Sequence, residues 1–255
     1  MPHAELQLMN IRIAPILIKT MLVKRMLIKT MLVSNFVLMS IFSAAAMADI
    51  FVDRAIVRLE PNSAPREDVK IINNGSEEGY VQVDVFEVRN PGTEQEERIK
   101  VTDPAAVKLI ASPSKLAIPP NGQKMVRIVN LDPSRAEERI YRINITPVLP
   151  PLQEQSGSVV RVVVAYQLLV IVDSAQPRED LDIQRSGYHL SVTNNGNTNV
   201  LISDGKQCEE ASEHCVDIAA HRVYPGNNWA TELIFDSPVT FKLTSFNGVR
   251  EFKTQ

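Results

Sequence analysis

The stretch VVRVVVAYQLLVIV, from Val159 to Val172, decides the fold of this chain. Twelve of its fourteen residues are apolar or aromatic, and only Arg161 and Gln167 are polar. β-Branched side chains favour the extended backbone of a strand, so the stretch predicts one β-strand. Strands in globular proteins usually run for about 5–6 residues, which makes this one unusually long.

Successive side chains of a strand point to opposite faces, and the two faces of this strand differ. One face is mixed and carries Arg161 and Gln167. The other is apolar apart from a tyrosine hydroxyl and consists of Val160, Val162, Val164, Tyr166, Leu168, Val170 and Val172. A strand that outgrows its own domain leaves an edge that invites aggregation unless it has a use. The alternative interpretation is a central core strand.

The rest of the chain also has the pattern of an all-β protein. Short β-branched runs alternate with turn signals such as Asn73-Asn74-Gly75-Ser76 and Asn90-Pro91-Gly92. Seven or eight such strands up to Val172 are typical of an immunoglobulin-like sandwich. A polar linker, Ser174–Glu179, separates them from a second, smaller β segment. With 255 residues, a net charge of −3 and no basic stripe, the chain is not expected to bind nucleic acid.

Residues 1–48 are typical of a secretory signal peptide. Basic residues precede the apolar segment Met31–Ala46, which is shorter than the roughly 20 residues of a membrane span. Cleavage is predicted after Ala48, in the motif Ala46-Met47-Ala48, and an uncleaved anchor is the alternative. The heptapeptide LIKTMLV occurs twice, which leaves the translation start open among Met1, Met21, Met26 and Met31.

The two cysteines and the few histidines do not indicate a catalytic site or a metal site. Cys208 and Cys215 are predicted to form one disulfide that closes a short loop in an oxidising compartment. His214 raises a zinc site as the rival, but no fourth ligand lies nearby. The chain contains no nucleophile elbow, phosphate-binding loop or H-E-x-x-H motif. We therefore predict neither catalysis, nor a metal, nor a cofactor.

Several stretches resemble the periplasmic chaperones of the chaperone–usher pilus pathway. IPPNGQKMVRI at Ile118–Ile128 and ERIYRI at Glu138–Ile143 are similar to two motifs of that family. SVTNNGN at Ser191–Asn197, the cysteine pair and Tyr224-Pro225-Gly226 look most like the alternative branch, which serves colonisation-factor-type pili. The resemblance implies two immunoglobulin-like β-sandwich domains, residues 49–175 and 176–255, arranged at an angle like a boomerang.

The family resemblance also implies a function in the periplasm. Such chaperones lend their long strand to a pilus subunit that lacks a strand, and they deliver the subunit to the outer-membrane usher. Val160, Val162 and Val164 would then fill the groove of the pilus subunit. The free chain is expected to self-associate through this strand, without inserting into the membrane after signal cleavage. The alternatives are a pilus structural subunit or adhesin, and a secreted enzyme or carbohydrate-binding domain.

One family feature is missing from the long strand. Family members commonly hold the C-terminal carboxylate of the pilus subunit with an Arg on the first strand and a Lys on the long strand. Here the long strand has no Lys, and the usual Arg position falls near Ile56 or Val57. The candidates for this role are Arg142, which matches the alternative branch, and then Arg58 and Arg54. The alternative for each arginine is a solvated strand face.

Glu138 is singled out for another reason. It matches a family position that is tied to contacts between the two domains. An exposed charge is the alternative interpretation of this residue.

Overall fold

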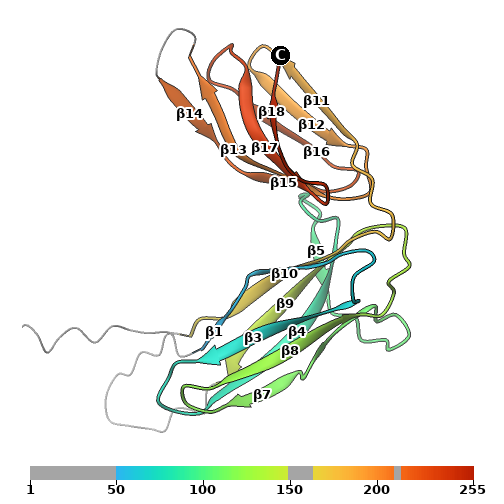
Figure 1. Cartoon of the computed structure of the whole chain (residues 1–255), viewed down its shortest axis with the longest axis vertical. Helices are drawn as coiled ribbons and strands as arrows, with labels where there is room; N and C mark the ends of the chain where they lie inside the picture. Colours follow the sequence, from blue (N-terminus) through green and yellow to red (C-terminus); the bar gives the residue numbers. More distant parts are fainter. Residues whose placement is uncertain (1–49, 149–162, 210–213) are drawn as a thin grey trace, which may run out of the picture. The chain divides into compact units, whose positions relative to one another are not determined.

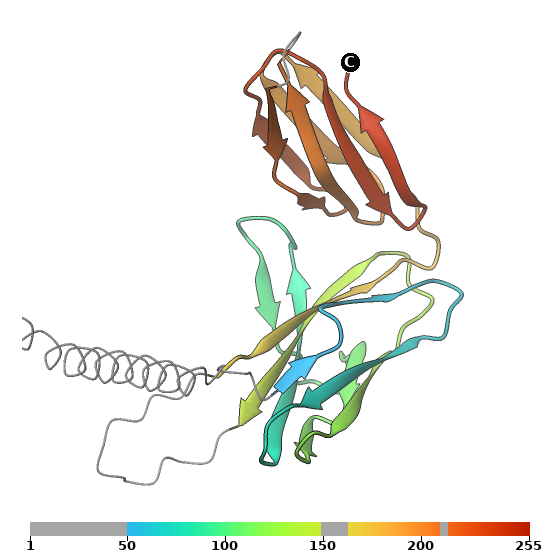
Figure 2. The same cartoon turned by 60° about the vertical axis from the view of Figure 1, so that its left-hand side comes forward.

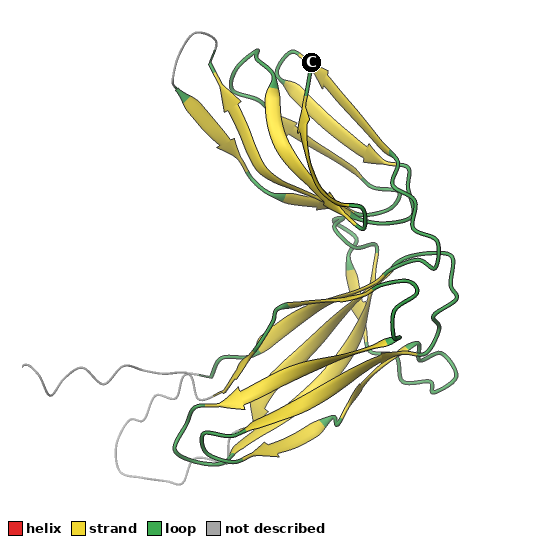
Figure 3. Cartoon of the chain, in the orientation of Figure 1, coloured by secondary structure: helices red, strands yellow, loops and turns green. Residues whose placement is uncertain are grey.

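The computed structural model describes residues 50–148, 163–209 and 214–255. These residues form strands and loops without a helix (Figure 3), which confirms the prediction of an all-β chain. Within these ranges, no helix is long and apolar enough to cross a membrane. The predicted signal peptide with its cleavage site, and the candidate residues Val160 and Val162, lie outside the described residues.

The first β-sandwich consists of two sheets (Figure 1). One has the order β1 (Ile50–Val52), β3 (Arg66–Asn73), β8 (Gln123–Asn130) and β6 (Leu109–Ser112). The other, with six strands, has the order β2 (Ile56–Leu59), β10 (Tyr166–Val172), β9 (Arg139–Val148), β4 (Gly79–Arg89) and β5 (Glu97–Ile99), with β7 (Lys115–Ile118) also paired to β4.

The second β-sandwich is smaller (Figure 2). Its three-stranded sheet has the order β11 (Leu181–Ser186), β12 (His189–Asn194) and β16 (Asn228–Glu232). Its five-stranded sheet has the order β14 (Cys215–Ile218), β13 (Val200–Cys208), β17 (Val239–Ser245) and β18 (Gly248–Lys253), with β15 (His221–Val223) also paired to β13. The prediction of two sandwiches is therefore confirmed.

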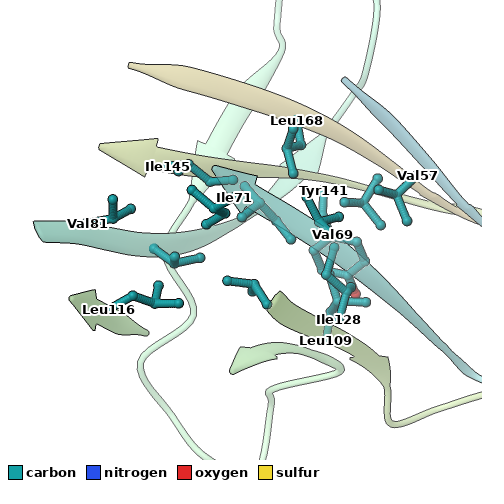
Figure 4. Close-up of a cluster of buried hydrophobic side chains, with 14 of the residues drawn as sticks. Val57, Val69, Ile71, Val81, Leu109, Leu116, Ile128, Tyr141, Ile145 and Leu168 are labelled. Carbon is teal, nitrogen blue, oxygen red and sulfur yellow. The ribbon is translucent and has the colours of Figure 1, made fainter. Parts of the chain in front are cut away.

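Alternating apolar residues build the core of the first sandwich. Ile71 on β3 and Ile128 on β8 face Ile143 on β9 and Leu168 on β10, and all four are almost completely buried. Figure 4 shows side chains from both sheets meeting in this layer. The apolar parity of β10 thus packs inward over Leu168, Val170 and Val172, as the sequence pattern predicts.

The opposite face of β10 is more deeply buried than the sequence suggests. Leu169 and Ile171 lie on this face, and both are buried, at 8% and 1% exposure. They form a separate cluster with Val88 and Ile140 from neighbouring strands and with Tyr224 from the second sandwich. Gln167 remains exposed. The mixed face is therefore polar only near the beginning of the strand.

Two strand-like stretches, residues 50–60 and the predicted long strand at Val159–Val172, have strand boundaries in the structure that differ from their sequence patterns. Residues 50–60 form two strands, because β1 pairs with β3 in one sheet and β2 pairs with β10 in the other. The long strand begins at Tyr166 in its described part, and residues 163–165 are not in a strand. Continuing the β9–β10 register would place Val164 opposite Pro147, and proline has no N–H to donate to a ladder.

Three short strands were not predicted from the sequence. β5 and β11 are rich in charged and polar residues, and β14 follows the cysteine loop. Each is paired along its length to a neighbouring strand: β4, β12 and β13, respectively. Tertiary pairing therefore sets their conformation more than local propensity does.

The predicted disulfide is confirmed. Cys208 and Cys215 are bonded and stand opposite each other in the pairing of β13 with β14. The bond therefore joins the ends of two adjacent strands in the second sandwich.

Replacing both cysteines with serine is expected to lower the free energy of unfolding by about 2 kcal/mol, because the unfolded chain regains the entropy of a short open loop. Urea denaturation of the wild type and the Cys208→Ser/Cys215→Ser variant measures this difference. As a control, a reducing agent should destabilise the wild type by a similar amount and leave the variant unchanged. Equal unfolding midpoints for the oxidised wild type and the variant would contradict the expectation.

Candidate functional site

The beginning of β10 has one open edge. Strand β2 pairs with β10 only from Leu169 to Val172, whereas β9 pairs with it from Tyr166 onward. The Leu169 N–H donates to the Ala55 carbonyl at the β2 edge, 2.9 Å away. Because N–H groups alternate along a strand, the Gln167 N–H faces the same edge. Within the described ranges no strand covers that edge before Leu169, so it can accept an additional strand.

Apolar side chains lead into this open edge. Val163 and Val164 are 43% and 45% exposed, and both lie within three residues before β10. Val164 has the same parity as Tyr166 and Leu168, which pack against the core. The side chain of Val164 is therefore apolar and exposed, as a donated strand requires. The other two candidates, Val160 and Val162, lie outside the described residues.

Two of the three candidate arginines already have carboxylate partners. Arg54 lies between β1 and β2, where its guanidinium is 3.2 Å from Asp53 and 3.6 Å from Glu67. Arg58 binds Asp173 with two hydrogen bonds of 2.7 and 2.8 Å, and the Asp173 side chain is fully buried. Such a bidentate pair satisfies the guanidinium and fixes its position. Arg58 therefore ties β2 to the end of β10.

Arg142 is the candidate without such a partner. It lies on β9 on the face turned away from the sandwich core, opposite Leu169 of β10 and Phe86 of β4. In the part of the chain that the structure describes, its side chain forms no ion pair, and its buried Nε atom has no hydrogen-bond acceptor. A partly buried guanidinium in this state is suited to an external anion.

Glu138 connects the two sandwiches. One of its carboxylate oxygens accepts hydrogen bonds from the Asn199 backbone N–H at 2.9 Å and from the Asn199 side-chain amide at 2.5 Å. The Thr198 hydroxyl lies 3.2 Å from the same oxygen. Burial raises the pKa of Glu138, and the Asn199 hydrogen bonds oppose this shift. An exposed charge does not describe this residue.

The sequence assigned no role to several residues around these sites. Asp173 neutralises Arg58, and Tyr224 covers the outer face of the six-stranded sheet. Arg222 and Asn199 are hydrogen-bonded to each other in the second sandwich. The signal available in the sequence was the spacing of Arg222 and Tyr224. Residues two apart in an extended chain have side chains on the same face. Among the described residues, no group of three or more His, Cys, Asp or Glu side chains is arranged to hold a metal ion.

Known proteins share this architecture. No family model matches the chain. By sequence, the chain is 26% identical to a CS1 fimbrial subunit of Escherichia coli over 179 residues, covering 66% of this chain and 74% of the relative.

Two solved structures give the fold. The class 5 fimbriae chaperone CfaA superposes with a TM-score of 0.59 at 20% identity, covering 81% of this chain and 99% of that chain. A structure of the Salmonella enterica SafA pilin in complex with the SafB chaperone matches with a TM-score of 0.56 at 14% identity, covering 83% and 98%. The chain therefore has the two-sandwich fold of pilus chaperones, and the resemblance seen in its motifs is confirmed at the level of fold.

Glu138→Ala is expected to destabilise the protein by about 1–3 kcal/mol, because it leaves the two Asn199 donors without an acceptor. Glu138→Gln retains an acceptor oxygen and should cost less. Urea denaturation of both variants tests the difference, and equal losses would contradict the role of Glu138 as an acceptor.

The same glutamate predicts a pH dependence. A raised pKa means that the folded state binds the proton more tightly than the unfolded state does. The unfolding free energy of the wild type should therefore fall, relative to that of Glu138→Gln, as the pH rises from about 4 to 7. This range begins near the ordinary pKa of glutamate. An unfolding free energy of the wild type that, relative to that of Glu138→Gln, stays constant or increases over this pH range would contradict the raised pKa of Glu138.

Proposed function

We propose that this chain is a periplasmic chaperone that binds pilus subunits and delivers them to an outer-membrane usher. It lends the client the strand that runs from about residue 159 into β10, and this strand fills a groove in an incomplete client sandwich. Its role is to bind and protect the client, and no reaction on the client is part of it.

The open edge of β10 is the observation that carries this proposal. The strand is anchored over Leu169–Val172 by partners on both sides, and before Leu169 no strand in the described ranges pairs with one of its edges. Exposed Val163 and Val164 continue from it. An anchored strand with a free edge offers main-chain hydrogen bonds for affinity and alternate side chains for the client's pockets.

The alternative, a pilus structural subunit or adhesin, is less well supported. A subunit that accepts a donated strand has a gap in its own sheet. Among the described strands, the core of the first sandwich is closed between its two sheets, with Ile71, Ile128, Ile143 and Leu168 fully covered. The chain is therefore better suited to donate a strand than to receive one.

Two features support a location in the periplasm. The predicted signal peptide would export the chain. The Cys208–Cys215 disulfide is expected to persist in an oxidising compartment.

Val164→Arg should weaken client binding by at least about tenfold, because a buried valine contributes roughly 1.5–3 kcal/mol and an arginine cannot replace it in an apolar pocket. The chain is co-expressed in the periplasm with each pilus subunit of its own strain, and soluble complex is quantified. Met125→Arg is the matched control, since Met125 is similarly exposed on the other sheet. A cognate subunit that stays soluble without the chain contradicts the proposed function, and equal binding by Val164→Arg contradicts the donated strand.

Arg142→Gln should weaken binding of the same client about 10- to 100-fold, the range expected for losing a hydrogen bond to a charged group. Arg54→Gln is the control, because Arg54 is exposed and already paired. Titration of the purified client measures both variants. Equal affinities of Arg142→Gln and the wild type would remove Arg142 as the carboxylate anchor.

A further inference from the structure

The turn between β4 and β5 is held in one conformation by its own residues. The ends of the two strands pair with each other, which closes the hairpin. The hydroxyl and the backbone N–H of Thr93 both donate to the Asn90 carbonyl, at 2.9 and 3.3 Å. The Gly92 N–H donates to the Glu96 carboxylate at 3.0 Å. Hydrogen bonds within the hairpin therefore order its turn.

A second ordered turn, Tyr224 to Asn227, belongs to the second sandwich. The Asn227 N–H donates to the Tyr224 carbonyl at 3.0 Å, which closes the turn. The Gly226 N–H donates to the Asn194 carbonyl, and the Asn194 N–H donates to the Asn227 carbonyl, both at 2.9 Å. Because Asn194 is fully buried at the end of β12, this turn is attached to the body of the second sandwich.

The two turns meet in what we call the hairpin contact. The Asn227 side-chain amide donates to the Pro91 carbonyl at 2.7 Å. Gly92 lies against the Tyr224 ring, and a Cβ atom at this position would stand only 2.9 Å from the ring carbon Cδ2. Gly92 also has a φ of +74°, which residues with a Cβ atom adopt only with strain. The hairpin contact therefore requires glycine at position 92.

A separate contact joins the sandwiches at Glu138, whose carboxylate accepts hydrogen bonds from Asn199. A cavity of about 670 Å³ is lined by Pro91 and Gly226 on the side of the hairpin contact and by Glu138 on the other side. The two contacts are thus different points of attachment. Two bodies that are joined at one point can rotate about it, whereas a second point of attachment removes most of this freedom.

The linker Ser174–Glu179 is also bound along part of its length. The Asn197 side-chain amide donates to the Gln176 carbonyl at 3.0 Å, and its oxygen accepts the Arg178 N–H at 2.6 Å. The Asn197 backbone N–H donates to the Arg178 carbonyl at 3.0 Å. The backbone of the linker is therefore held by the second sandwich.

We propose that the hairpin contact fixes the orientation of the second sandwich on the first, and that Gly92 is the residue that permits it. Domains joined by a linker usually move relative to each other unless an interface holds them. When the hairpin contact is broken, the second sandwich rotates about the Glu138 contact and the linker. The proposal concerns the free chain and does not depend on the proposed function.

NMR residual dipolar couplings of the weakly aligned, monomeric chain, purified from the periplasm, test this. One alignment tensor is expected to fit the couplings of both sandwiches in the wild type. In Gly92→Ala the added Cβ displaces the Tyr224 ring. The couplings of the second sandwich should then shrink relative to those of the first, because motion between the sandwiches averages them.

Gly187→Ala is the matched control. Gly187 also has a positive φ, of 57°, but no atom lies within 4 Å of the position that its Cβ would take. This variant carries a similar backbone strain without touching the hairpin contact, so a single tensor should still fit both of its sandwiches.

Asn227→Ala provides a second route to the same result, should Gly92→Ala fail to fold. It removes the hydrogen bond to Pro91 and leaves Gly92 unchanged. It should reduce the couplings of the second sandwich in the same direction, by less than Gly92→Ala does. Slow amide exchange in the cores of both sandwiches confirms that each variant is folded.

Two results would overturn the proposal. Separate tensors for the two sandwiches of the wild type would show that their orientation is not fixed. A single, wild-type tensor for both Gly92→Ala and Asn227→Ala would show that the Glu138 contact and the linker suffice, even if the variants are less stable. Neither result uses a client, so the proposed function stands or falls independently.

Discussion

The pairing of β10 with two neighbours over only part of its length is the constraint on which the rest depends. From Leu169 to Val172 the strand has β2 on one edge and β9 on the other, and both of its faces are buried. Before Leu169, none of the described strands pairs with its β2-side edge. A strand held this firmly at one end can present the other end to a partner without unfolding the sandwich that carries it.

The arginines around β10 also fall into two groups, those paired inside the protein and those without an ion pair to a described residue. The Arg58–Asp173 pair is internal, bidentate and largely buried, so it stabilises the junction of β2 and β10. Arg142, by contrast, forms no ion pair with a described residue, and its buried Nε atom has no hydrogen-bond acceptor. Removing one partner of a buried ion pair is costly, so we expect Arg58 to matter for stability and Arg142 for binding.

Local pattern was sufficient to predict an all-β chain with two sandwiches and the disulfide in its short loop. Local pattern was insufficient for segments whose conformation depends on the strand with which they pair. Nothing in residues 50–60 shows that Ile50–Val52 and Ile56–Leu59 enter different sheets, and charged β5 has no strand signal of its own. Leu169 and Ile171 looked half-exposed because their cover, Tyr224, comes from more than fifty residues further along the chain. Arg142 was singled out by family resemblance, whereas Asn199 was found only through its hydrogen bonds to Glu138 of the first sandwich.

Hydrogen exchange at the free edge of β10 tests strand donation most directly. The amide of Gln167 faces that edge, as does the amide of Ala165 if the alternation continues. We expect both amides to exchange quickly in the free, monomeric chain and slowly in the complex with a pilus subunit, because the client strand accepts their hydrogen bonds. Unchanged fast exchange of the Gln167 amide in a fully formed complex would contradict donation of this strand.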